Sequence, residues 1–206
     1  TLWTWGNGTY GQLGNGGYGD GVGLDAIQAR PVKILDGVRT VSCGYSHAAA
    51  IKTDGSLWMW GYASNGELGN GGTGNTIHPS SDNYDTYYCQ TVPVKIMDGV
   101  VAVSCGGSYT AAIKTDGSLW MWGDNHLGQL GDGTLEDKTY PVKIMDNVRA
   151  VNCNTGSTIV IKTDNSLWAW GWGTEALGED GVGNAEVTMD GSTFPTQTTP
   201  VKIMDN

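Results

Sequence analysis

Hydrophobic and polar positions alternate over short stretches along most of the chain, and no stretch has a helical period. The string VVAVSCG, which starts at Val100, places β-branched residues at alternating positions, and SLWMWG, which ends at Gly123, alternates large apolar side chains. A period of two is typical of half-buried β-strands. Asp116 and Gly117 precede SLWMWG, and Asp-Gly is the preferred pair for a two-residue hairpin loop. The pattern therefore predicts antiparallel strands joined by tight turns.

The predicted strands recur as a unit. The string IKTDGSLWMWG occupies residues 51–61 and 113–123, and IKTDNSLWAWG occupies residues 161–171. PVKI occurs four times, and a VxxVSC-like string occurs three times. Each unit thus has four strands, and equivalent tryptophans lie 48 to 62 residues apart, a spacing that with its aromatic signature favours propeller blades. We predict an all-β fold of about 3.5 blades of four antiparallel strands, in a single repeat domain over residues 1–206.

The segments that follow these strands carry a further motif. They read WGNGTYGQLGNG, WGYASNGELGNG, WGDNHLGQLGDG and a degenerate WGWGTEALGEDG. Together with PVKI and VSCG, this unit resembles the regulator of chromosome condensation (RCC1-type) repeat in its bacterial form. The resemblance implies a seven-bladed β-propeller, of which this chain would form about half. The histidine typical of the repeat is His47 in the first copy, but Tyr109 and Ser157 in the next two.

The number of repeats does not close a ring. A partial propeller leaves unpaired strand edges, and repeat arrays normally carry polar caps at their ends, which this sequence lacks. We expect the chain to be a segment of a longer propeller. The alternative is a homo-oligomer in which the open blade edges pair between copies.

The 206 residues have a formal net charge of −10, and this charge is unevenly distributed along the chain. The joints between WxWG and PVKI, at residues 6–30, 61–92, 123–140 and 171–199, hold 14 of the 21 acids and only two of the 11 bases. We interpret them as loop insertions on one acidic face of the propeller. Such a face favours a basic protein partner and argues against nucleic acid, whose phosphates need clustered Lys and Arg. No apolar run of 18 residues is present, so we expect no membrane insertion.

Aromatic residues in the joints are candidates for recognition, because tyrosine combines an apolar ring with a polar tip. The strongest group is the string NYDTYYCQ in the second joint. The candidate binding residues are Tyr84, Tyr87, Tyr88, Asp82 and Asp85, followed by Trp172, Tyr10 and Tyr18. The paired tryptophans of the WxWG strands, in contrast, recur in every copy, which favours packing between blades.

Metal and cofactor chemistry have weak support. Glycine-rich turns with carboxylates can hold calcium, and Asp20, Asp25, Asp180 and Glu186 lie in such turns, but their spacing does not match that of EF-hand loops. We therefore predict no metal and no cofactor. Three of the four cysteines occupy the same position in successive repeats, too far apart for disulfides, so we expect free thiols.

No set of residues has the spacing of a known catalytic motif, so we do not predict an enzyme. Our hypothesis is a non-catalytic protein-interaction module that uses the acidic, tyrosine-bearing loops. One alternative is a structural subunit that assembles through its open edges. Guanine-nucleotide exchange on a small GTPase is a second alternative, which the resemblance to eukaryotic members implies, and a glycan-active enzyme would rest only on loop carboxylates. The bacterial resemblance implies a secreted or cell-surface protein, whereas free thiols are more common in the cytoplasm.

Overall fold

The computed structural model describes residues 1–17, 27–72, 74–79, 86–173, 183–189 and 192–205. All regular elements in this part of the chain are β-strands. The described part of the chain contains no helix that is long and apolar enough to cross a membrane.

The strands form four antiparallel sheets. The first has two strands, β1 (Leu2–Asn7) and β2 (Ile27–Leu35). The second has the order β3-β4-β5-β7-β6, from β3 (Val38–Cys43), β4 (His47–Lys52), β5 (Leu57–Tyr62), β6 (Thr76–Pro79) and β7 (Thr86–Met97). The third has the order β8-β9-β10-β11, from β8 (Val100–Cys105), β9 (Tyr109–Lys114), β10 (Leu119–Gly123) and β11 (Lys138–Met145). The fourth has the order β12-β13-β14-β16-β15, from β12 (Val148–Cys153), β13 (Ser157–Lys162), β14 (Leu167–Trp172), β15 (Ala185–Met189) and β16 (Ser192–Met204).

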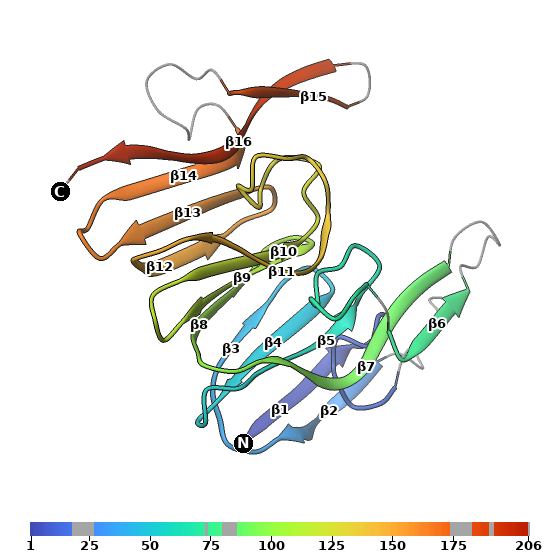
Figure 1. Cartoon of the computed structure of the whole chain (residues 1–206). Coiled ribbons are helices and arrows are strands. Elements are labelled where there is room, and N and C mark those ends of the chain that lie inside the picture. The colour runs from blue at the N-terminus through green and yellow to red at the C-terminus, as the bar shows by residue number, and fades with distance from the viewer. Residues whose placement is uncertain (18–26, 73, 80–85, 174–182, 190–191, 206) are drawn as a thin grey trace.

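The sheets follow one another along an arc that does not close, with the two chain ends at its opposite ends (Figure 1). Three sheets contain the four predicted strands, so the chain is a partial propeller of about three and a half blades. The second and fourth joints are partly strand, because β6 and β15 each form a hairpin with the long strand that follows and widen their sheets to five strands (Figure 1).

Neighbouring blades are connected by a repeated polar contact along their innermost strands, β3, β8 and β12. The backbone N–H of Cys105 donates to the Ser42 hydroxyl at 2.9 Å, and that of Cys153 donates to the Ser104 hydroxyl at the same distance. The serine of each VSC motif therefore bonds the cysteine of the next. All four cysteines are free, as expected.

The second tryptophan of each WxWG motif lies in the core between two blades. Trp122 and Trp170 are fully buried, and each indole N–H donates to a carbonyl oxygen in the preceding joint, that of Glu67 at 2.8 Å and that of Gln129 at 2.9 Å. The loop approaches the ring so closely that a Cβ on Gly69 would lie 2.9 Å from the Trp122 indole nitrogen. Gly69 also has a φ of +73°, so both space and backbone conformation require glycine at this position. The Gly-x-Leu-Gly motif thus forms the surface on which the next blade's tryptophan packs, and we call it the seat of that tryptophan.

Among the described residues, no loop covers the second tryptophan of the half-blade β1–β2 in this way. Trp5, which is equivalent to Trp122, is 60% exposed, and Trp3 is 50% exposed. Together with Val41 and His47 they line a groove of about 360 Å³. The core prediction for the tryptophan pairs therefore does not apply to this first copy.

The hairpins between the second and third strands of each blade, such as that between β4 and β5, differ from the predicted two-residue loops. Lys52 N–H donates to Ser56 O, and Gly55 N–H donates to Lys52 O, which encloses three residues. Within this loop Gly55 has a positive φ of 82° but Asp54 does not, as expected of a type I turn followed by a glycine bulge. The reason lies in the aspartate, whose carboxylate accepts from both N–H and hydroxyl of Ser56 and holds the turn in this form.

The antiparallel order gives each blade two different ends. The joints meet the loops between the first two strands at one end, where Tyr62 N–H donates to Ser46 O and Asp124 N–H donates to Ser108 O. We call this end the loop face. The three-residue hairpins and the turns that follow the PVKI strands meet at the other end, where Val100 N–H donates to Gly55 O. We call this end the hairpin face.

Candidate functional site

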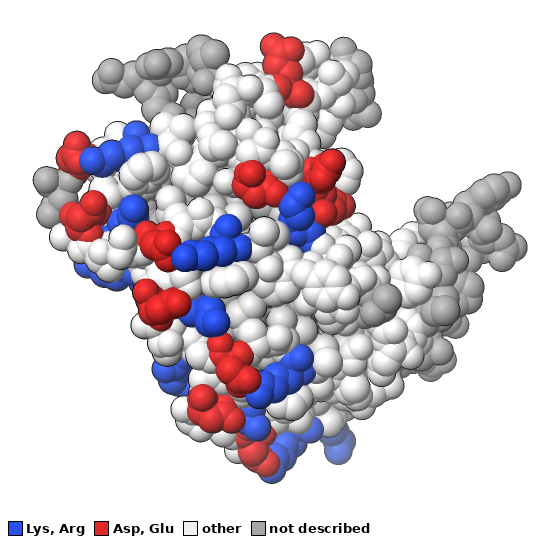
Figure 2. Space-filling view, viewed as in Figure 1, with Lys and Arg blue, Asp and Glu red and all other residues white. Residues whose placement is uncertain are grey.

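The hairpin face is rich in charge, and it carries one lysine–aspartate ion pair in each repeat. In each repeat the lysine of PVKI contacts the aspartate three residues later, as Lys95 contacts Asp98 at 2.8 Å and Lys143 contacts Asp146 at 2.8 Å. Figure 2 shows alternating blue and red side chains in a band that runs from the upper left of the molecule down to its lower edge. A surface of alternating charges carries little net field, so this face offers no strong attraction to a charged partner.

The loop face has a different character, because it carries a cluster of tyrosines. The rings of Tyr10 and Tyr62 meet edge to face with centroids 5.5 Å apart, and Tyr87 lies 6.1 Å from Tyr10 and 5.8 Å from Tyr62. Together with Tyr45 and Glu67 they line a pocket of about 260 Å³. The pocket lies where the first joint, the second joint and the inner loops meet.

Glu67 is the only acid in this pocket lining, and its side chain is almost completely buried. Its carboxylate accepts from the N–H of Asn65 at 2.9 Å. Burial is the main cause that raises the pKa of Glu67 to about 8; backbone N–H donors act against it, and the negative charges of Asp124 and Asp137 add to it. The group therefore exchanges its proton near neutral pH, as groups at functional sites often do.

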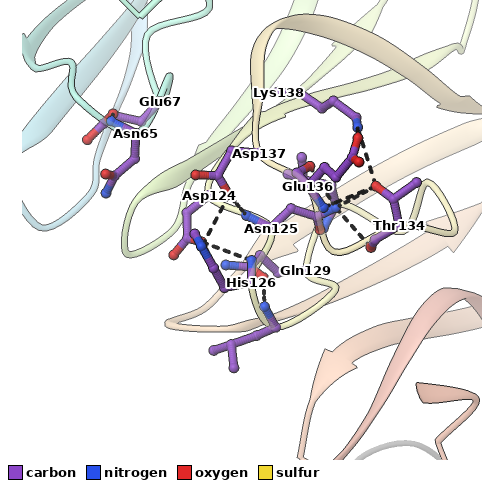
Figure 3. Close-up of polar contacts among 12 residues, drawn as sticks. Asn65, Glu67, Asp124, Asn125, His126, Gln129, Thr134, Glu136, Asp137 and Lys138 are labelled. Atoms are coloured by element: carbon purple, nitrogen blue, oxygen red, sulfur yellow. Dashed lines mark hydrogen bonds and ion pairs between the residues drawn. The ribbon is translucent and has the colours of Figure 1, made fainter. Parts of the chain in front are cut away.

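The third joint lies beside Glu67 and is folded around one buried side chain, that of Asn125 (Figure 3). The Asn125 amide donates to the Asp132 carboxylate at 3.1 Å and to the carbonyl oxygens of Thr134 and Glu136 at 3.0 and 3.2 Å. Its own carbonyl oxygen accepts from Leu130 N–H at 3.0 Å. These bonds close the loop into a compact turn.

The same joint brings together the groups best placed to hold a cation. Ligand atoms of Asp124, His126 and Asp137 lie within 4.8 Å of one another. His126 Nδ1 lies 2.8 Å from Asp124 and 3.3 Å from Asp137, and the hydrogen bond to Asp124, followed by the charge of Asp137, raises the pKa of His126. A protonated His126 already neutralises part of this acidic pair. The group is different from the calcium candidates of the sequence, of which only Glu186, on β15, lies among the described residues.

The candidate recognition residues separate into two groups. Tyr10 and Tyr87 meet in the pocket, whereas Tyr88 is on the other side of β7 and is 38% exposed. Trp172 lies far along the chain, on the last described blade, and packs edge to face on Phe194 with centroids 6.2 Å apart. Tyr18, Asp82, Tyr84 and Asp85, and the calcium candidates Asp20, Asp25 and Asp180, lie outside the described residues.

Sequence reasoning missed the residues that complete the pocket, Tyr62 and Glu67. Both could be found by comparing the repeats with one another, because Glu67 stands where the first and third copies have Gln12 and Gln129. A single acid in a motif that is otherwise neutral is such a signal. Tyr62 is the last residue of β5, where it pairs with Cys89, and it lines the pocket.

The histidine typical of the repeat is a structural residue in this chain. His47 is buried, and its Nε2 lies 3.0 Å from the Thr110 hydroxyl of the next blade. Burial lowers the pKa of His47 to about 4, against a small opposing effect of the Tyr109 backbone, so the ring is neutral at pH 7. Tyr109 replaces it in the next copy and donates to Ser157 O at 2.5 Å, which preserves the contact between blades with other atoms.

These features can be compared with known proteins. The model of the regulator of chromosome condensation (RCC1) repeat matches residues 1–51, 54–113 and 116–161, more than half of the chain. The chain belongs to the RCC1 repeat family. Among RCC1 relatives, it is 31% identical over 141 residues to the ultraviolet-B receptor UVR8 of Arabidopsis thaliana, which covers 66% of this chain and 28% of UVR8. It is 34% identical over 140 residues to the E3 ubiquitin-protein ligase HERC2 of Homo sapiens, which covers 65% of this chain and 2% of HERC2.

Solved RCC1-type structures agree with the fold. Human WBSCR16 aligns with a TM-score of 0.71 at 22% identity, and Prp20p of Saccharomyces cerevisiae aligns with a TM-score of 0.71 at 19% identity. Each alignment covers 98% of this chain and 46% of the solved chain. The chain therefore spans just under half of these propellers, and less than a third of the two curated relatives above.

Proposed function

We propose that this RCC1-repeat chain is a non-catalytic protein-interaction module whose loop face binds the partner. The observation that carries the proposal is the contrast between the two faces. Lysines and aspartates pair on the hairpin face, whereas the loop face presents a tyrosine-lined pocket and acids with few bases near them. Aromatic side chains beside a pocket are typical of the centre of a protein interface.

The range of known RCC1 proteins supports a scaffold that serves different partners. A receptor and a ubiquitin ligase both contain the repeat, so the blades alone do not determine an activity. The yeast propeller Prp20p was studied for its binding to Gsp1p and histones, which shows that this fold binds proteins in that case.

The charge of the joints supports a basic partner. Among the described residues the loop face carries the acids of the third joint, Asp124, Asp132, Glu136 and Asp137, with Lys138 paired to Asp132 at 3.2 Å. Eight of the 14 joint acids lie outside the described residues and add to the formal charge of these segments. Such a charge repels phosphate backbones, so we do not propose nucleic acid as the partner.

The proposal is tested with variants that remove similar groups from opposite faces. Glu136 on the loop face and Asp98 on the hairpin face have side chains that are 83% and 71% exposed. A partner is first captured on the immobilised wild-type chain from cells that produce it, and is then purified. We expect Glu136→Gln and Tyr45→Ala to weaken its affinity at least fivefold, while Asp98→Asn leaves it unchanged. Equal effects on both faces, or none on the loop face, would refute the proposal.

A second candidate function is assembly through the half-blade, because Trp3 and Trp5 expose half or more of their surface beside a groove. An exposed apolar surface of this kind is typical of a contact site. Light scattering on the purified chain gives its solution mass. A species larger than 21.8 kDa that Trp5→Glu converts to the monomer would support assembly, and a wild-type monomer would contradict it.

A further inference from the structure

The pocket between the first two joints contains one acid, Glu67, at a position where the first and third joints have glutamine. Gln12 and Gln129 occupy the same position and make the same bond, since their side-chain oxygens accept from Tyr10 N–H and Leu127 N–H at 2.8 Å. Glu67 makes this bond to Asn65 at 2.9 Å. The turn therefore forms with either side chain, and its folding does not require the acid.

A charged carboxylate at this position lowers the stability of the folded chain, because Glu67 is only 1% exposed. Burying a carboxylate without a counter-ion is unfavourable. No lysine or arginine is found among the residues that line the pocket, which are all described. The charged groups that influence Glu67 from neighbouring elements, Asp124 and Asp137, are themselves acidic. The site lacks a positive charge that a ligand can supply.

The walls of the pocket are suited to such a ligand. Tyr10 and Tyr62 meet with ring planes at 87°, and Tyr10 and Tyr87 meet at 79°. The three rings thus present faces in more than one direction around the same pocket that Glu67 lines. The electron-rich face of an aromatic ring attracts an ammonium group, most strongly where water is excluded.

We propose that the pocket formed by Tyr10, Tyr62, Tyr87 and Glu67 binds an organic ammonium group, the lysine side chain of a protein partner. The tyrosine faces contact the methylenes and the cation, and the Glu67 carboxylate is its counter-charge. This inference rests on the proposed function, because the lysine belongs to the partner.

Binding is expected to depend on pH in a defined direction. The free protein holds Glu67 largely protonated below its pKa of about 8. A bound ammonium group favours the carboxylate, so binding releases a proton and the affinity increases as pH rises toward 8. Tyr62 and Cys89 also lie near Glu67, and burial raises the pKa of both, that of Cys89 to about 11, so neither titrates in this range. His126, which contacts Asp124 and Asp137 and has a raised pKa, does change its charge in this range, and the Glu67→Gln variant separates its effect from that of Glu67.

The experiment uses the full chain and two matched pairs of probes, observed by ligand NMR and calorimetry. Nα-acetyl-lysine methylamide is compared with its uncharged norleucine analogue, and choline with the neutral isostere 3,3-dimethylbutanol. We expect the lysine amide to bind at least tenfold more tightly than norleucine amide at pH 8. The gain from pH 6 to pH 8 is expected to be at least fivefold.

Glu67→Gln keeps the turn and is expected to lower the lysine-amide affinity at least tenfold and to abolish its pH dependence. Tyr10→Leu removes one ring and is expected to weaken binding at least threefold, whereas Tyr140→Leu, on exposed β11 outside the pocket, leaves it unchanged. Equal binding of lysine and norleucine amides, or full binding by Glu67→Gln, would overturn the proposal. Binding of choline without lysine amide would overturn the assignment to a partner's lysine.

The captured partner separates this proposal from the function on which it rests. If Glu67→Gln keeps full affinity for the partner while Glu136→Gln and Tyr45→Ala lose it, the lysine site is refuted and the interaction module stands. If no loop-face variant affects the partner, the proposed function fails, even where the pocket binds lysine amide.

Discussion

In the second joint a tyrosine follows the WxWG motif, whereas in the third joint an aspartate, Asp124, stands at the same position. The next residue is Ala63 in the second joint and Asn125 in the third, and the motif glutamine is replaced by Glu67 only in the second. Both joints nevertheless seat the tryptophan of the following blade through the same backbone carbonyl. The comparison teaches that the backbone of the turn carries the fold, while its side chains are free to form either a pocket or a closed polar loop.

The largest expected loss of stability comes from removing the buried tryptophan that each of the two joints contacts. Trp122→Ala and Trp170→Ala each empty a fully buried site and remove an indole hydrogen bond. We expect each to lower the free energy of unfolding by about 3–5 kcal/mol, measured by denaturant unfolding. Trp5→Ala is the control, because that ring is exposed and its loss should cost about 0.5 kcal/mol or less. A large cost at Trp5, equal to that at Trp122, would mean that its side chain is also covered.

The next effect tests the one acid by which the second joint departs from the motif. The pKa of Glu67 is raised from 4.5 to about 8 in the folded chain, so the folded state keeps a proton that the unfolded state has lost. The contribution of Glu67 to the free energy of unfolding is therefore fully present below pH 4.5 and is lost as pH rises through 8. We expect Glu67→Gln to be more stable than the wild type by on the order of 3 kcal/mol at pH 9 and similar to it at pH 4.5.

The reverse substitution in the third joint makes this prediction more specific. Gln129→Glu introduces the acid into the third joint at a site that is equally buried. Its stability should fall relative to the wild type over the same rise in pH. Thermal unfolding of the three proteins at pH 4.5, 7 and 9 measures the differences, and pH-independent differences would contradict the assigned cause.

A smaller effect is expected from the residue that closes the third joint. Asn125→Ala removes an amide that donates to Asp132, Thr134 and Glu136. We expect a loss of about 2 kcal/mol in the free energy of unfolding, because the Asp132 carboxylate and two backbone carbonyls lose a donor that is itself buried. Ala63 at the equivalent position shows that the turn accepts alanine, so the fold should persist and faster amide exchange should be confined to the third joint. Unchanged exchange at residues 132–137 would contradict this role.

The smallest effect concerns His126, whose side chain is 76% exposed. The hydrogen bond to Asp124 raises the pKa of His126, so its contribution to stability is present below pH 6.5 and is lost as pH rises through the folded pKa. Because the pair is exposed, we expect no more than about 0.5 kcal/mol. NMR titration should show a lower His126 pKa in Asp124→Asn, and an unchanged value would exclude Asp124 as the main cause.

The repeats made the blades predictable, because the same strings must form the same strands and each buried tryptophan recurs. The resemblance to RCC1 repeats is confirmed by the family match, and the partial propeller is confirmed by the fold. The candidate site was harder to predict, because it is formed between joints and depends on how side chains leave the repeated strands. Tyr10 and Tyr87 were identified as aromatic residues of the joints, whereas Tyr62 was not singled out and Glu67 was counted only among the acids of the second joint.

Other properties depend on residues that differ between copies. The second and fourth joints contain the additional hairpins of β6 and β15, which no repeated string indicated. The binding roles of the tyrosines, the compartment and the basic partner remain predictions.

The seat of each tryptophan lies in the joint that precedes its blade, and this order has an evolutionary consequence. A tandem duplication that copies a stretch from one WxWG motif to the next carries with it the loop that receives the tryptophan of the following copy. Such units can be added or lost without a change to the interface between blades, and the identical strings at residues 51–61 and 113–123 are expected after recent copying. The duplicated stretch includes the joint. Each added blade therefore has its own joint, in which a substitution such as that at Glu67 can arise.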